Sequence, residues 1–327
     1  LEDEPRFDYS GGATCPSLLL EPSRTNLVTQ SEYFEDSDWT NKVDITFDFG
    51  YLAPDGTNSA YKITSSGANA HLASNFQTSI VSGVHKSIWA KTTSGTGKVS
   101  LLNHNGDTNA LFDITNEWQR FDISHASPNF FYAVDFRASG ATLSEVLIWG
   151  AQAETGSYPT SYIPNHSGGT ITRGADVCGN AGDVNTFNST EGVLYLEASS
   201  IDNGSSEKGL ALNDGSTNNR INIRIVNNFI RAYGVVGGSL VCLMTYTAPS
   251  VTSINKIAFK YKENDFALWV NGVERVTDNS GSIFPANTLN ELSFDYGGAS
   301  AFFYGNVKQV LTFNTALSDA DLTTLTT

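Results

Sequence analysis

The pattern of apolar and polar residues in this 327-residue chain predicts β-strands rather than helices. The most legible run is Arg220–Tyr233, in which polar and apolar residues alternate from the first position. A period of two places alternate side chains on opposite faces of a strand. One face carries Ile221, Ile223 and Ile225, and the other carries Arg220, Asn222 and Arg224. We therefore expect a strand with one buried face and one polar face.

A two-residue turn at Asn227–Asn228 would fold this run into a hairpin. The opposed pairs would be Ile225 with Ile230, Arg224 with Arg231, and Asn222 with Tyr233. Two arginines directly opposite each other repel unless an acidic group neutralises them. That group is either a neighbouring carboxylate of the protein or a uronate or sulfate of a bound glycan. The sequence leaves both alternatives open.

Similar runs, separated by turns rich in Gly, Asn, Asp and Ser, fill both halves of the chain. In the first half they are Ala60–Thr64, Lys86–Thr92, Lys98–Asn103, Gln119–Ser124, Phe130–Arg137 and Leu143–Gly150. In the second half they are Gly192–Ser199, Lys256–Lys262, Phe266–Val276, Leu292–Tyr296, Phe302–Gly305 and Val307–Phe313. One short helix is expected at Asp319–Leu325, because Ser318 and Asp321 form a capping box. The expected fold class is all-β.

The stretch Glu145–Arg173 separates the two halves. It opens as a strand that is apolar on both faces, ends at Gly150, and continues into Pro159 and Pro164, which cannot extend a ladder. We interpret it as the closing strand of one domain and the link to the next. The expected organisation is an extended N-terminal segment (1–30), a β-sandwich (31–165), a linker (166–189) and a second β-sandwich (190–327).

The apolar triplet Leu18–Leu20 lies between Pro16 and Pro22, which break helix formation on both sides. Three consecutive leucines in an extended segment need a covering surface. We expect them to lie against the first sandwich or against a neighbouring subunit.

Composition and charge limit the kinds of partner that we expect this protein to bind. The formal net charge of −15 argues against nucleic acid, whose phosphates require a basic surface. No apolar run reaches the roughly 18 residues that a membrane span needs. The three cysteines show no disulfide or metal-binding spacing and are expected to be buried thiols.

The sequence shows no set of residues with the spacing of a known catalytic site. The nearest carboxylate pair on one strand face is Glu291 and Asp295, which are four residues apart and hence roughly 13 Å apart along a strand. A retaining glycosidase needs its two carboxyl groups about 5–5.5 Å apart. The five histidines show no metal-ligand spacing. We therefore expect two surface acids and a non-enzymatic protein.

Aromatic and polar side chains that could bind a sugar remain. Sugars present apolar C–H faces ringed by hydroxyl groups, which suit exposed Trp or Tyr together with Asn and Arg. In the first half the candidates are Trp89, Phe131, Tyr132 and Arg137. In the second half they are Asn222, Arg224, Arg231 and Tyr233. For Trp89 the core and a ligand platform are equally good interpretations.

Three stretches carry a resemblance to a known family. The N-terminal RFDYSGGATCPSLLLEPSRTNLVTQSEYFEDSDWT and the central WGAQAETGSYPTSYIP with TRGADV resemble the jelly-roll, carbohydrate-binding-module-like domain of bacteriophage tail-fibre and other virion structural proteins. The C-terminal ELSFDYGGASAFFYGNVKQVLTFNTALSDADLTTL resembles the last strands and helix of a concanavalin-A/laminin-G-like sandwich. The resemblance implies two tandem antiparallel sandwiches, a jelly roll and then a concanavalin-like domain.

The resemblance also carries functional expectations. It implies a fibre segment of a virion, extracellular when mature, that presents glycan-binding domains for attachment to a host surface. Its partners would be an extracellular or cell-surface glycan, other virion proteins and two further copies in a homotrimer. Asp55, in the turn Pro54-Asp55-Gly56, resembles a position near a structural calcium ion in related jelly rolls. No other cofactor is expected.

Two alternatives to the fibre function stay open. The chain could be an ancillary carbohydrate-binding region of a secreted polysaccharide-degrading enzyme. It could also be a structural element that binds no ligand.

Overall fold

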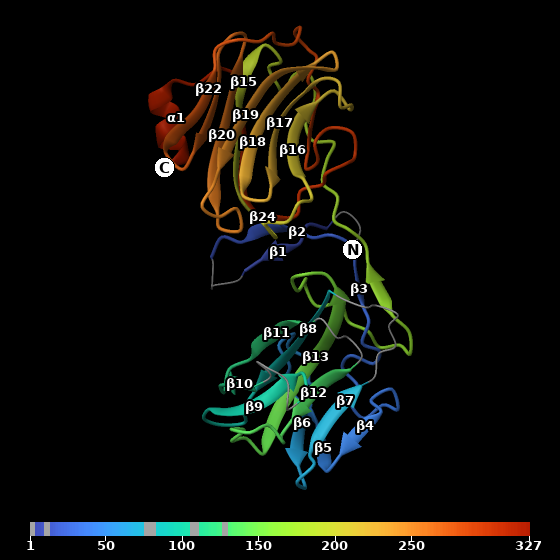
Figure 1. The fold of residues 1–327 in the computed structure, drawn as a ribbon. Coiled ribbons are helices and arrows are strands. Elements are labelled where there is room, and N and C mark those ends of the chain that lie inside the picture. The colour runs from blue at the N-terminus through green and yellow to red at the C-terminus, as the bar shows by residue number, and fades with distance from the viewer. Residues whose placement is uncertain (1–3, 10–13, 75–82, 105–110, 126–129) are drawn as a thin grey trace. The chain divides into compact units, whose positions relative to one another are not determined.

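The computed structural model describes residues 4–9, 14–74, 83–104, 111–125 and 130–327. The chain forms two compact units (Figure 1). We call Ser23–Gly174 the N-terminal sandwich, and we call Ala175–Thr327 together with the N-terminal segment that ends at Pro22 the C-terminal sandwich. Both are built from antiparallel strands, so the predicted all-β fold class is confirmed.

The N-terminal sandwich has two five-stranded sheets, ordered β10-β9-β12-β7-β4 and β11-β8-β13-β6-β5, and a two-stranded sheet, β14-β3. Its strands are β3 (Arg24–Asn26), β4 (Asn41–Val43), β5 (Ile45–Tyr51), β6 (Ala60–Ser65), β7 (His71–Ser74), β8 (Val84–Lys91), β9 (Gly97–Leu102), β10 (Leu111–Ile114), β11 (Gln119–His125), β12 (Phe131–Asp135), β13 (Glu145–Thr155) and β14 (Ile171–Arg173). Its main core contains residues of both five-stranded sheets, such as Ile63, Ile88, Val99 and Ile148.

The C-terminal sandwich pairs a seven-stranded sheet, β1-β2-β24-β15-β20-β21-β22, with a five-stranded sheet, β19-β18-β17-β16-β23. Its elements are β1 (Phe7–Asp8), β2 (Ser17–Leu20), β15 (Glu191–Ser200), β16 (Lys208–Asn213), β17 (Arg220–Val226), β18 (Phe229–Val236), β19 (Ser239–Thr247), β20 (Asn255–Lys262), β21 (Phe266–Val270), β22 (Val273–Asp278), β23 (Glu291–Ser293), β24 (Gly305–Phe313) and the helix α1 (Asp319–Thr326).

Strand β15 is buried on both faces. Leu194 and Leu196 lie in the core that the two sheets of the C-terminal sandwich share. Val193 and Tyr195 point the other way, into a small cluster with Leu322 of α1. The helix therefore covers the outer face of the seven-stranded sheet, beside β20, β21 and β22 (Figure 1).

The helix begins as predicted. Ser318 is the N-cap, and its hydroxyl accepts a hydrogen bond from the backbone N–H of Asp321 and donates one to the Asp321 carboxylate. The register of the β17–β18 hairpin is also confirmed, with Arg224 opposite Arg231 and Asn222 opposite Tyr233. The turn residue Asn227 has a φ of 51°, a conformation that asparagine tolerates better than most residues.

The N-terminal segment belongs to the C-terminal sandwich, which differs from the expected cover for the leucine triplet. Strand β2 pairs with β24, and Leu20, 4% exposed, lies in the core of the C-terminal sandwich. Leu18 packs against the same core. The compact units therefore divide at Ser23 and Ala175 rather than at the boundaries expected from the sequence.

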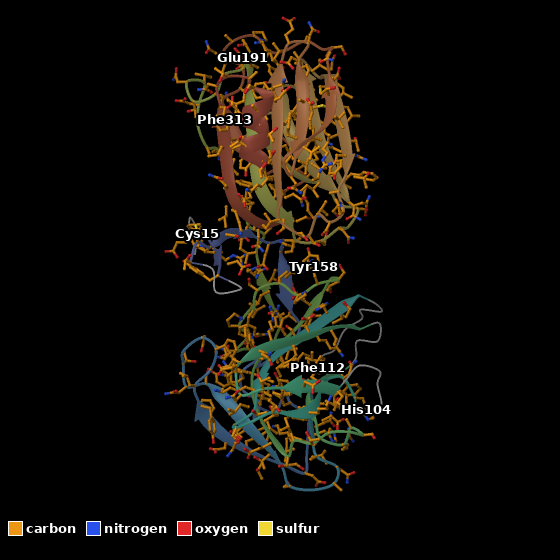
Figure 2. All side chains as sticks on the ribbon, turned by 90° about the vertical axis from the view of Figure 1, so that its left-hand side faces the viewer. Cys15, His104, Phe112, Tyr158, Glu191 and Phe313 are labelled. Carbon is orange, nitrogen blue, oxygen red and sulfur yellow. The ribbon has the colours of Figure 1, made fainter. Side chains whose placement is uncertain are left out.

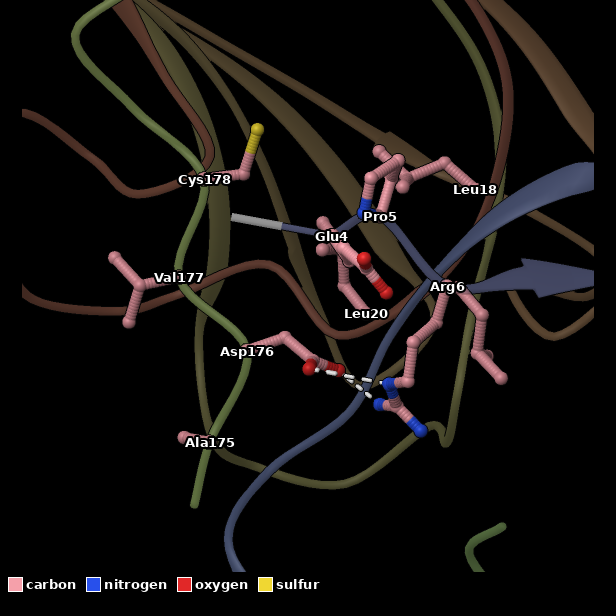
Figure 3. Close-up of a pocket in the computed structure, with 10 residues that line it drawn as sticks. Glu4, Pro5, Arg6, Leu18, Leu20, Ala175, Asp176, Val177 and Cys178 are labelled. Carbon is pink, nitrogen blue, oxygen red and sulfur yellow. Dashed lines mark hydrogen bonds and ion pairs between the residues drawn. The ribbon is translucent and has the colours of Figure 1, made fainter. Parts of the chain in front are cut away.

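Three charged side chains fasten this segment to the rest of the C-terminal sandwich. Arg6 donates to the Asp176 carboxylate through Nε and Nη2 (Figure 3). It also donates to Glu21 through Nη1, which lies 2.7 Å from Oε2. The backbones of Glu21 and Asp176 also bond, with N–H of Asp176 2.9 Å from the carbonyl oxygen of Glu21. Arg6 and Asp176 line a groove of about 530 Å³ with Leu18, Leu20 and Cys178.

Strand β13 does not end at Gly150, as the sequence predicted, but continues to Thr155. Gly150 has a φ of 65°, and the pairing of β13 with β8 shifts register between Trp149 and Gln152. Such a bulge lets a strand bend and go on. The predicted strand end is therefore wrong because a glycine at positive φ marks a bulge here.

The segment after β13 returns over its own strand. Glu154 accepts hydrogen bonds from the Gln152 amide and from both the backbone N–H and the hydroxyl of Thr160, all at 2.7–2.8 Å. Arg24 lies 3.6 Å from the same carboxylate and stacks on Tyr158, which is labelled in Figure 2. This buried polar network holds the proline-containing tail on the N-terminal sandwich.

The cysteines are unpaired, and Cys15 is exposed, which corrects the expectation that all three are buried (Figure 2). Cys242 is buried in the C-terminal sandwich, where burial raises the pKa of its thiol to about 12. Among the described residues, no helix has the length and apolar character to cross a membrane.

Candidate functional site

The outer face of the five-stranded sheet of the C-terminal sandwich carries a cluster of arginines and tyrosines. We call it the arginine–tyrosine face, and its members are Arg220, Asn222 and Arg224 of β17, Arg231 and Tyr233 of β18, Glu207 and Tyr296. Alternation along β17 directs Arg220, Asn222 and Arg224 to the outer face of the sheet. Ile221, Ile223 and Ile225 point to the other face and lie in the core. The structure thus brings together all four candidates predicted from the second half of the chain.

Glu207 neutralises part of this charge. Its Oε2 lies 2.9 Å from Nη1 of Arg224, and its Oε1 lies 4.0 Å from Nη1 of Arg231. Of the two alternatives that the sequence left open, the structure therefore shows a protein carboxylate beside the opposed arginines. Its side chain remains about one-third exposed, so solvent screens the pair.

Arg224 is stacked on two aromatic rings. Its Cζ lies 4.0 Å from the centre of the Tyr233 ring and 4.3 Å from that of Tyr296. Arg220 also contacts Tyr296, with Cζ 5.0 Å from the ring centre. A cation over a ring contributes about 0.5–1 kcal/mol when exposed and about 2 kcal/mol when desolvated. The stacking therefore holds the guanidinium groups in fixed orientations.

Tyr296 reaches this face from the turn that follows β23. The Asp295 carboxylate is buried and accepts hydrogen bonds from the N–H groups of Gly297 and Ala299, which fixes the turn. Gly209 of β16 allows the turn to lie close, because a Cβ there would be 2.8 Å from the Asp295 carbonyl oxygen. Only a glycine at this position permits such an approach.

The expected pair of surface acids is therefore corrected. Asp295 is buried and engaged by its turn, and it also accepts a hydrogen bond from Ser293. Glu291 accepts a hydrogen bond from the backbone N–H of Asn180. Both carboxylates act as acceptors that shape the loops around the five-stranded sheet.

No carboxylate of the described residues contacts Arg220 as a counter-ion. Arg220 is 8% exposed, and among the described residues no group accepts a hydrogen bond from its guanidinium or lies within ion-pair distance of it. Burial and the nearby charge of Arg224 lower the pKa of Arg220. The arginine–tyrosine face thus has three arginines and one carboxylate, in a chain whose net charge is −15.

Asn222 lies between Arg220 and Arg224 on the same face and is 0% exposed. Within the described part of the chain, neither its amide nitrogen nor its amide oxygen has a hydrogen-bond partner. An unsatisfied buried amide costs about 1–3 kcal/mol, and native proteins rarely leave one unexplained. A ligand-binding role is one explanation for such a cost.

An apolar surface adjoins the tyrosine. Leu243 of β19 is directly opposite Tyr233 and is 48% exposed. Thr245 is opposite Arg231 in the same way and is also exposed. The face therefore combines an aromatic and aliphatic strip with guanidinium, hydroxyl and amide groups.

The four candidates of the first half do not form one site, although the side chains of Tyr132 and Arg137 are in hydrogen-bonding contact. Phe131 is 0% exposed and lies in the core of the N-terminal sandwich, so its proposed contact with a sugar is corrected. Arg137 makes a bidentate pair with the buried Asp135, at 2.8 and 2.6 Å. Tyr132 is half-buried on β12 beside the rings of His71 and His104. Trp89 is on β8, in the five-stranded sheet that does not contain β12.

Trp89 joins a small aromatic cluster with Trp149, Trp118, Tyr51 and Tyr162. Its indole N–H is buried without a hydrogen-bond partner among the described residues. The bulge at Gly150 and the returning tail create this cluster on the outer face of the sheet. Trp89 is thus half-buried in a secondary core.

Asp55 accepts hydrogen bonds from the backbone N–H and the hydroxyl of Thr57, at 2.9 and 2.7 Å. Both bonds go to the same carboxylate oxygen, so the residue caps its own turn. In the described ranges no group of three or more His, Cys, Asp or Glu residues could hold a metal ion. The calcium assignment stays a prediction from resemblance.

One contact of the N-terminal sandwich was not foreseen. His85 lies 2.8 Å through Nε2 from the Asp122 carboxylate and 2.9 Å through Nδ1 from the Ser124 hydroxyl. The hydrogen bond from His85 lowers the pKa of Asp122. Asp122 and Ser124 are two residues apart on β11, which pairs with β8, so this contact links the two strands.

Sequence reasoning missed Arg220, Glu207 and Tyr296 as parts of the site. The alternation with Asn222 and Arg224 already placed Arg220 on the polar face and could have identified it. Glu207 and Tyr296 lie 17 and 72 residues from Arg224 in loops, and no local pattern connects them to it.

No protein-family model and no curated protein matches this sequence. The chain has distant structural similarity to several solved sandwich domains. One is the CBM40 domain of the Ruminococcus gnavus IT-sialidase bound to α2,3-sialyllactose, at 16% identity and a TM-score of 0.37, over 42% of this chain and 83% of that one. Domain 4 of AbnA, an extracellular arabinanase from Geobacillus stearothermophilus, matches at 13% identity and a TM-score of 0.37, over 53% of this chain and 84% of that one.

Domains LG4-5 of the mouse laminin α1 chain match at 11% identity and a TM-score of 0.35, over 75% of this chain and 86% of that one. Identities and TM-scores this low support no statement about function.

Proposed function

We propose that this protein binds carbohydrate, without catalysis, through the arginine–tyrosine face of its C-terminal sandwich. The observation that carries the proposal is the half-buried Tyr233 beside the exposed Leu243, bordered by arginine, amide and hydroxyl groups. A sugar ring stacks its C–H face on an aromatic ring and directs its hydroxyl groups to the polar border. The arrangement offers both kinds of contact within one short strand pair.

The fixed orientation of the groups favours binding. Tyr233 is held by the stacked guanidinium of Arg224, which is held in turn by Glu207. A ligand that meets groups already fixed in place loses less conformational entropy on binding. The face therefore suits a weak-to-moderate binder whose affinity rises through repeated copies on a particle or surface.

Replacing Tyr233 by Ala is expected to weaken glycan binding about tenfold, because the stacking surface is lost. The loss should be nearly the same at low and high salt, since stacking on a sugar ring is not ionic. A panel of neutral and acidic oligosaccharides identifies a ligand, and titration calorimetry then gives Kd for each variant.

Tyr9→Ala is the matched control, because Tyr9 is an exposed tyrosine of the same unit outside the face. Equal binding by Tyr233→Ala and the unmodified chain would contradict the assignment of this face. A chain that binds no member of the panel would contradict carbohydrate binding altogether.

The resemblance of the sequence to tail-fibre proteins supports a more specific proposal. The chain would be an extracellular fibre segment of a virion that contacts other virion proteins and a host-surface glycan. The expected assembly is a homotrimer. Sedimentation equilibrium should therefore give about three times the 35.2 kDa chain mass, and a monomer at micromolar concentration would contradict it.

A further inference from the structure

We propose that the arginine–tyrosine face selects glycans that carry an anionic substituent, a carboxylate or a sulfate ester, and that Arg220 is the residue that binds this substituent. The inference rests on the proposed function and names the ligand class of the same site. Carboxylates and sulfates share the property that matters, several acceptor oxygens around one negative charge, which a guanidinium can bind in a bidentate manner.

The charge balance is the first support. Glu207 lies against Arg224 and, more distantly, Arg231, and it is the one carboxylate that the described residues contribute to the face. Arg220 contacts Tyr296, and none of the described residues places a carboxylate within ion-pair distance of its guanidinium. The charge of Glu207 acts on Arg220 only from farther away. In a chain with 34 acidic and 19 basic residues, an arginine buried beside another arginine is an unexpected arrangement. An anion from outside would supply the missing counter-charge.

The buried amide of Asn222 is the second and independent support. The residue follows Arg220 by two positions, so the two side chains leave the same face of β17 at neighbouring points, roughly 7 Å apart along the strand. Its amide can donate to an anionic oxygen and accept from a sugar hydroxyl. Both atoms are without a protein partner among the described residues. Arg220 and Asn222 together form a donor set for a substituent with several acceptors.

Glu207 has a further role in this arrangement. Its carboxylate occupies the place on Arg224 that an anion from a ligand could take, and its side chain is about one-third exposed on the segment before β16. It therefore competes with the ligand for Arg224 and limits affinity for anionic glycans. Removing its charge should strengthen anion binding, whereas a purely structural ion pair would give no gain.

The test compares matched ligands on the full chain. Oligogalacturonides are measured against their methyl esters, and oligosaccharides of a sulfated galactan are measured against their desulfated form. Titration calorimetry at low and high salt gives Kd for each. We expect binding of the charged member of at least one pair to exceed that of its neutral partner about tenfold and to weaken with salt. The pair that responds distinguishes carboxylate from sulfate.

Arg220→Gln is expected to abolish this preference, lowering affinity for the charged member about tenfold and leaving the neutral member unchanged. Lys308→Gln is the matched control, since it removes one positive charge from an exposed position of β24 outside the face. It should change affinity less than twofold. Equal losses in the two variants would show a general effect of net charge and overturn the proposal.

Glu207→Gln provides a variant at a more exposed position, in case Arg220→Gln does not fold. It should tighten binding of the charged member about threefold, and unchanged or weaker binding would count against the proposal. Equal binding of charged and neutral members with dependence on Tyr233 would overturn this inference and leave the proposed function standing. Absence of binding to any of these ligands and to the wider panel would remove the proposed function itself.

Discussion

Replacing Leu20 by Ala should lower the free energy of unfolding of the C-terminal sandwich by about 3 kcal/mol, a usual cost for a cavity of this size in a core. Leu20 lies far from Ala175 in the sequence, but its side chain belongs to the core of the C-terminal sandwich. Each sandwich has its own core, so each should unfold in its own transition. Differential scanning calorimetry should show one transition shifted and the other unchanged.

Leu19→Ala is the control for this experiment. Leu19 is the neighbouring residue on β2 and is only half-buried, so its truncation should cost less than about 1 kcal/mol. A shift confined to the transition of the N-terminal sandwich would contradict the placement of the segment. Separate expression of Ser23–Gly174 assigns the two transitions.

Replacing Glu154 by Ala should destabilise the N-terminal sandwich by about 3 kcal/mol. The carboxylate is 1% exposed and accepts three hydrogen bonds, from Gln152 and twice from Thr160. Its removal takes the acceptor from the buried N–H and hydroxyl of Thr160 and leaves Arg24 without its nearest carboxylate. The Gln152 amide keeps only longer hydrogen bonds to the carbonyl oxygens of Thr160 and Ser161. Urea unfolding of isolated Ser23–Gly174, followed by tryptophan fluorescence, measures the loss.

Glu145→Ala gives the comparison, because Glu145 begins the same strand and is half-buried, and its carboxylate accepts a hydrogen bond from the Thr93 hydroxyl. Its loss should be below about 1 kcal/mol. Equal effects at the two positions would show that the network around Glu154 contributes no more than an ordinary surface contact.

Local pattern was sufficient wherever the contacts are local. Alternation of isoleucines with polar residues and a two-residue turn at Asn227–Asn228 gave the face and register of the β17–β18 hairpin. The capping box at Ser318 likewise gave the start of α1. In both cases the residues that decide the structure lie within about ten positions of each other, so their spacing carries the information.

Prediction from local pattern failed where a glycine could take either of two structural roles. Gly150 was interpreted as the end of a strand, and it is a bulge from which β13 continues to Thr155. Both uses exploit the same freedom at positive φ. The difference depends on β8, which pairs with β13 on both sides of the bulge, and on the tail that bonds to Glu154.

The sequence by itself determined the all-β class, the strand positions near the site, and four of the side chains on the polar face. Tertiary structure alone decided that the N-terminal leucines enter the C-terminal sandwich and that Glu207 and Tyr296 reach the arginines. The physical reason is the distance along the chain between the residues that make each contact. Periodicity reports which face of a strand a side chain takes, whereas the choice of a neighbour across a sheet or from a distant loop depends on packing between segments that are remote in the chain.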